Sequence, residues 1–134
     1  MLSYSQFSML RRIVLGLSGL VCLLYAVLAL IMRNPAPISP WLPWMSGALG
    51  LFVIFAAARL AGPDQVRRAK DELFRHDAQT AQRVGFWVAL SLYPIFAIPL
   101  SLDLIAWPVA FAAMGTLSAA AFLLSFVWCD MRGG

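Results

Sequence analysis

Four long stretches of this chain contain no charged residue: residues 13–32, 34–58, 84–102 and 104–129. Together they make up about two thirds of the 134 residues. Each is close to or above the roughly 20 residues that a helix needs to cross a hydrocarbon core about 30 Å thick. We therefore predict an all-α integral membrane protein with four transmembrane helices, at about residues 11–32, 41–60, 84–102 and 105–129.

The remaining residues are too few to bury a separate soluble core, so we expect residues 1–134 to form a single membrane domain. Hydrophobic residues make up 62% of the chain, and the formal net charge is +4. Because the positive residues lie beside the spans, lipid and topology explain them, and we expect no nucleic-acid partner. The expected partners are the lipid bilayer and either other membrane-protein subunits or further copies of the chain.

The positive residues also predict the orientation of the spans. Arg33 is the only one between the first and second spans, whereas the other nine precede the first span, follow the fourth, or lie between the second and third. Cytoplasmic loops carry the excess of Lys and Arg, so we predict that both termini are cytoplasmic. Arg outnumbers Lys nine to one, which favours a GC-rich bacterial genome and hence a multi-pass protein of the bacterial inner membrane.

Residues 63–83 form the only sizeable polar segment. Charges spaced four residues apart predict a charged cytoplasmic helix that lies on the membrane surface or continues into the third span. Its simplest interpretation is a solvated, ion-paired helix, and protein recognition is the alternative. The candidate partner-docking residues are Arg67, Arg68, Asp71, Glu72, Arg75 and His76.

Small residues recur along the spans at positions where helices can approach closely. The candidate helix-packing residues are Ser18, Cys22, Gly47, Gly50, Gly115 and Ala119, and we favour contacts within one chain over contacts with a partner. In the third span, Pro94 and Pro99 are candidate kinks, because proline removes a backbone hydrogen bond. A static bend is the simplest interpretation, and a hinge facing a ligand is the alternative.

The uncharged stretches lack Asp, Glu, Lys, Arg and His, the residues on which ion-coupled transport and haem binding usually depend. The only histidine, His76, lies in the polar segment, where Glu72 shares its helix face but too few further ligands are present for a metal. We therefore predict no catalytic residue, no cofactor and no metal site.

The leading hypothesis is a non-enzymatic accessory or scaffold subunit that packs against other membrane helices. The first alternative is a small oligomeric channel or transporter for a neutral or apolar solute. Its path would be lined by the polar side chains of the spans, namely Ser18, Tyr25, Ser91, Tyr93, Thr116, Ser118 and Ser125. The second alternative is a membrane-tethered regulator that binds a soluble partner through residues 63–83.

Overall fold

The computed structural model describes residues 3–69 and 72–133, apart from the side chains at positions 4, 65, 68, 69, 72 and 73. The described chain is helical, without strands: α1 spans Tyr4–Met32, α2 Leu42–Ala61, α3 Pro63–Ala69, α4 Glu72–Ser101 and α5 Trp107–Gly133. Four of these helices, all except the short α3, are long and apolar enough to cross a membrane. The expected all-helical fold and its four apolar helices are therefore confirmed.

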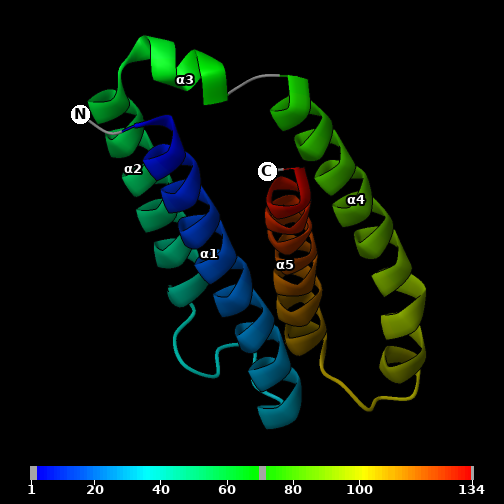
Figure 1. Cartoon of the computed structure of the whole chain (residues 1–134). Helices are drawn as coiled ribbons and strands as arrows, with labels where there is room; N and C mark the ends of the chain where they lie inside the picture. The colour runs from blue at the N-terminus through cyan, green and yellow to red at the C-terminus, as the bar shows by residue number, and fades with distance from the viewer. Residues whose placement is uncertain (1–2, 70–71, 134) are drawn as a thin grey trace.

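Two of the long helices begin well before the uncharged stretches do. The first turn of α1 is held by a capping box, in which Ser3 Oγ accepts from the Gln6 amide and Gln6 Oε1 accepts from the Ser3 amide. Residues 72–83 form the first turns of α4, so this part of the polar segment continues into the third apolar helix. Residues 63–69 instead form α3, which crosses the end of α2 (Figure 1).

The termini and α3 lie at one end of the molecule, here called the terminal end, and the loops 33–41 and 102–106 lie at the other, the loop end (Figure 1). At the loop end, a charged residue with left-handed backbone follows each of α1 and α4: Arg33 (φ 50°) directly after Met32, and Asp103 (φ 54°) two residues after Ser101. The amide of Asp103 donates to Leu100 and that of Leu104 to Pro99, which is a Schellman motif. Asp103 therefore follows the C-terminus of a helix and does not cap an N-terminus, and it is exposed, which fits an acid that faces water at the boundary.

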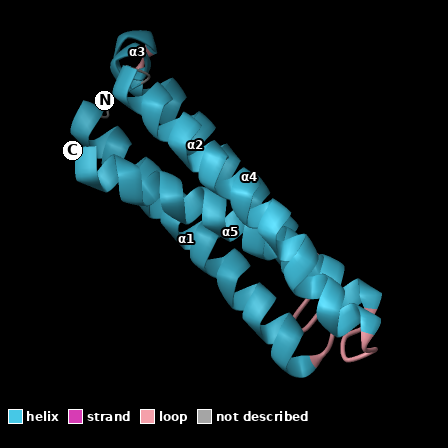
Figure 2. Cartoon of the chain, turned by 90° about the vertical axis from the view of Figure 1, so that its right-hand side faces the viewer, coloured by secondary structure: helices cyan, strands magenta, loops and turns pink. Residues whose placement is uncertain are grey.

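The four long helices form an open arrangement. The central pair is α1 and α5, α2 packs on α1, and α4 packs on α5, with no extensive contact between α2 and α4 in the described chain. Figures 1 and 2 show α2 and α4 on the same side of the central pair. The buried clusters reflect this, because one joins α1 to α2 around Phe7 and Ala57, and another joins α4 to α5 around Phe96 and Ala113.

A tightly packed glycine lies at each of the three contacts between long helices. A Cβ at Gly19 of α1 would lie 3.0 Å from Leu124 of α5, and one at Gly85 of α4 would lie 3.2 Å from Phe122 Cβ of α5. A Cβ at Gly50 of α2 would lie 3.2 Å from Val14 of α1. The backbones approach as closely as they do because these positions lack a side chain.

Candidate functional site

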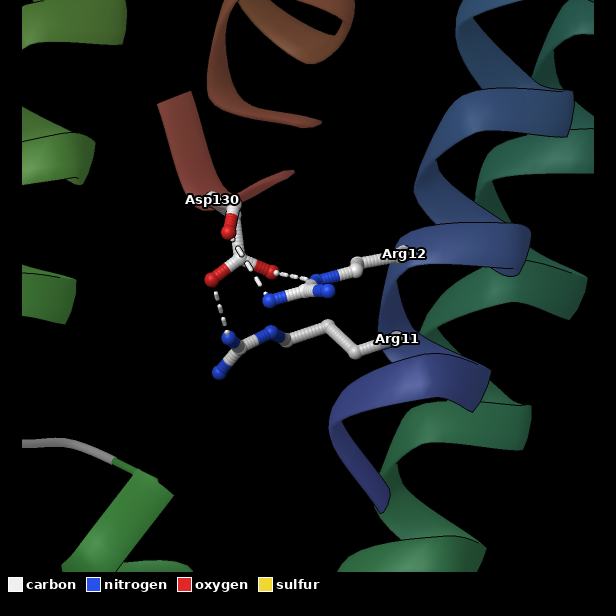
Figure 3. Close-up of polar contacts among 3 residues, drawn as sticks. All are labelled: Arg11, Arg12 and Asp130. Carbon is white, nitrogen blue, oxygen red and sulfur yellow. Dashed lines mark hydrogen bonds and ion pairs between the residues drawn. The ribbon is translucent and has the colours of Figure 1, made fainter. Parts of the chain in front are cut away.

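The first notable site is a buried charge cluster at the terminal end, where the start of α1 meets the end of α5. Arg11 Nη2 lies 3.0 Å from Asp130 Oδ1, and Arg12 Nε lies 2.8 Å from Asp130 Oδ2 (Figure 3). Arg12 Nη2 also donates to the Asp130 backbone carbonyl at 2.8 Å. One carboxylate thus receives two guanidinium groups, and the side chains of Arg11 and Asp130 are only 9% and 10% exposed.

Aromatic rings extend this cluster to α4. The Arg11 guanidinium carbon lies 4.8 Å from the centre of the Phe74 ring and 5.6 Å from that of Phe126. The two rings themselves meet edge to face, with centroids 5.4 Å apart. Cation–π contacts of this kind gain strength when the cation is desolvated. Arg11 therefore connects α1 to both α4 and α5.

A second acid is buried on α4, one turn after Phe74. Asp77 is 5% exposed, and its Oδ2 accepts no hydrogen bond from the described residues. Its Oδ1 lies 3.9 Å from Nδ1 of His76, whose side chain is mostly exposed. A buried carboxylate oxygen is costly unless it accepts a hydrogen bond, and no described residue supplies one to Asp77 Oδ2.

Neither the ion pair nor the burial of Asp77 is predicted from the sequence, where Asp77 belongs to a polar cluster expected to be solvated. A signal for the ion pair was available, because with four spans the first residues of span one and the last residues of span four lie at the same end. Arg11 and Arg12 precede the first uncharged stretch and Asp130 directly follows the fourth, which places opposite charges at similar depth. Asp77 has no such signal, since its burial depends on which face of α4 meets α5.

The second site is an apolar groove of about 660 Å³ on the central pair beside α2, toward the loop end. Residues of α1, α2, α5 and the loop 33–41 line it: Ser18, Cys22, Tyr25, Pro35, Pro40, Pro43, Trp44, Ser46, Gly47, Ala48, Leu51, Phe111, Ala112, Gly115, Thr116, Ala119 and Leu123. The loop is held over the groove by Tyr25, whose hydroxyl donates to the Pro35 carbonyl at 3.1 Å.

The hydroxyl groups of the groove wall are partly satisfied within their own helices. Thr116 donates to the Ala112 carbonyl at 2.7 Å, and Ser46 donates to the Pro43 carbonyl at 2.9 Å. Their hydrogens are therefore used locally, which lowers the polarity that the wall presents to a ligand. The groove suits an apolar surface better than a charged one.

Five of the six candidate packing residues line this groove: Ser18, Cys22, Gly47, Gly115 and Ala119. A Cβ at Gly47 or Gly115 would meet no described atom within 4 Å. Gly50 instead lies at the close contact between α2 and α1. The small residues are thus divided between a helix contact and an open surface, and their role in helix packing stays a prediction.

The candidate docking residues lie on two helices rather than one. Arg67 is exposed on α3, and Arg75 and His76 are exposed on the first turns of α4. The placement of Asp71 and the side chains of Arg68 and Glu72 lie outside the described residues. Docking through this segment therefore stays a prediction.

The two candidate kink residues lie inside α4, which continues as one helix past Pro94 and Pro99. Pro94 leaves the Leu90 carbonyl without its helical donor. The Ser91 hydroxyl donates at 2.7 Å to Trp87, one turn earlier, and not to Leu90. The static bend expected at these prolines, and its alternative, a hinge, both stay predictions.

Among the described residues no group of three or more His, Cys, Asp or Glu side chains is placed to hold a metal ion. Both cysteines are free: Cys22 is buried and Cys129 is half-buried. The chain was also compared with known proteins, and no protein-family model, curated protein or solved structure matches it.

Proposed function

We propose that the chain is a non-enzymatic integral membrane protein that serves as an accessory or scaffold subunit, and that its groove receives a transmembrane helix of another subunit. In this proposal the four long helices cross a bacterial inner membrane, with the terminal end in the cytoplasm. The charge distribution supports that orientation. Arg33 is the only Lys or Arg in the two loops of the loop end, whereas the other nine lie before the first span, after the fourth, or between the second and third.

The observation that carries the proposal is the groove with its two uncontacted glycines. Gly47 and Gly115 lie on two helices that face one another across the groove, and neither has a described neighbour where a Cβ would stand. Small residues on a membrane helix allow another backbone to approach closely and make van der Waals contact. In a closed four-helix bundle, the helices of one chain fill the space at the centre of the bundle. Here that space beside α1 is open, and an apolar helix of another subunit would fill it.

The test is to fill the groove with a side chain. Gly47→Leu and Gly115→Leu should preserve folding, because the added atoms enter open space, but they should remove the partner. The tagged protein is extracted from its own membrane in a mild detergent, and bound subunits are weighed by native mass spectrometry. Ala97→Leu is the matched control, since Ala97 is exposed on α4 away from the groove.

Wild type and Ala97→Leu should carry a stoichiometric membrane partner, and the two glycine variants should carry less than a tenth as much. If the glycine variants retain the partner at the wild-type level, a helix does not occupy the groove. If wild type is recovered alone or only with copies of itself, the accessory role is wrong.

A small transporter for a neutral or apolar solute is the second candidate. It is favoured by the fact that Ser18, Tyr25 and Thr116 line the groove, which gives the wall a few polar groups. Ser91 and Tyr93 lie on exposed positions of α4 and do not line the groove, which weakens the continuous polar path that transport requires. Solute flux into liposomes containing the purified protein would support this candidate over the first.

A further inference from the structure

A separate hollow of about 480 Å³ lies at the corner where α2 ends and α3 begins. Its apolar walls include Phe55 and Ala58 of α2 and Val66 of α3. Two cationic side chains, Arg59 and Arg67, also line it, one from each helix. We call this site the corner hollow, and it shares no lining residue with the groove.

The two arginines of the corner hollow are not neutralised by the described side chains. Neither Arg59 nor Arg67 has an ion pair or a hydrogen bond from its side chain in that part of the chain. Arg59 lies with its guanidinium carbon 5.8 Å from the centre of the Phe55 ring, which keeps it against the wall. Asp64 is the acid of α3, and it does not line the hollow.

Two guanidinium groups that pair with no described acid, above apolar walls, match one chemical class, an amphiphile with an anionic head. Guanidinium forks pair with phosphate oxygens through two parallel hydrogen bonds, and the aromatic and aliphatic walls suit the glycerol and the first carbons of an acyl chain. Neighbouring Arg residues at the cytoplasmic end of a membrane helix are attracted to anionic lipids.

We propose that Arg59 and Arg67 hold the phosphate of an anionic phospholipid in the corner hollow. The proposal rests on the membrane insertion proposed above, which places the end of α2 at the headgroup depth of the cytoplasmic leaflet. The lipid then joins α2 to α3 and fixes the angle at which α3 crosses the end of the helices (Figure 1).

The test is native mass spectrometry of the full-length protein in detergent with added phosphatidylglycerol or phosphatidylcholine. Wild type should bind phosphatidylglycerol in preference to phosphatidylcholine. Arg59→Gln/Arg67→Gln should weaken phosphatidylglycerol binding about 25-fold, at about fivefold per arginine. Arg75→Gln/Arg83→Gln is the matched control, because it removes the same charge from exposed positions of α4 outside the hollow.

Helix content by circular dichroism shows that each variant is folded before its lipid binding is compared. Equal loss in the two double variants would mean general attraction to positive charge and would overturn the site. Retention of phosphatidylglycerol by the Arg59/Arg67 variant would overturn it as well. Displacement of bound phosphatidylglycerol by millimolar inorganic phosphate would show that the site selects the free anion, and it would overturn the assignment to a lipid.

The same spectra report the subunit partner as a separate mass. Loss of lipid with the partner retained would therefore bear on the corner hollow alone, whereas absence of the partner with lipid retained would bear only on the accessory role.

Discussion

At the scale of single residues, the contacts of Asp130 explain how two adjacent arginines are accommodated at the start of an apolar helix. Removing a charge from water is expensive, and a buried pair compensates only when geometry is good and the remaining groups are satisfied. Here the side-chain carboxylate and the backbone carbonyl of Asp130 together accept three hydrogen bonds from Arg11 and Arg12. The ring faces of Phe74 and Phe126 cover the more buried arginine.

Asp130→Asn should destabilise the protein by about 3 kcal/mol, because it leaves two guanidinium groups against a neutral amide in a largely buried site. Arg11→Gln should lower the thermal unfolding midpoint in detergent more than Arg12→Gln does, since the Arg12 side chain is 31% exposed and the Arg11 side chain 9%. A larger loss for Arg12→Gln would show that burial does not set the strength of this cluster.

At the scale of helices, small residues serve two different purposes that the sequence does not separate. Gly85 and Gly115 both lie in uncharged stretches, yet Gly85 contacts α5 and Gly115 lies on an open surface. The number and approximate positions of the long helices could be predicted, because length and apolarity are local properties. Which glycines lie at a helix contact and which lie on an open surface could not be predicted, because this depends on which helix lies opposite.

Alanine substitution separates the two kinds of glycine. Gly85→Ala should destabilise by about 1 kcal/mol, since the new methyl group would lie 3.2 Å from Phe122 Cβ, which moves only with the backbone of α5. Gly115→Ala should leave the unfolding midpoint unchanged or slightly higher, because alanine favours helix and the space is open. Equal shifts in the two variants would contradict the helix contacts described here.

At the scale of the whole molecule, the helices form an open arrangement with most of its charges at the terminal end; Arg33 and Asp103 lie at the loop end. The asymmetry of charge was readable from the sequence, since it depends only on which loop each residue occupies. The packing order α2, α1, α5, α4 could not be predicted from the sequence, because it depends on contacts between residues far apart in the chain. The early start of α1 depends on the Ser3–Gln6 capping box, a short polar signal outside the apolar pattern.

The proposed topology requires that the terminal and loop ends lie on opposite sides of a membrane. Single cysteines can be placed at exposed positions in a Cys22→Ala/Cys129→Ala background and labelled with a membrane-impermeant maleimide. Ile38→Cys and Ala106→Cys at the loop end should react in intact cells, whereas Ser5→Cys and Gln79→Cys at the terminal end should react only in inverted membrane vesicles. Labelling of both ends from the same side, or of the terminal end in intact cells, would contradict the proposed topology.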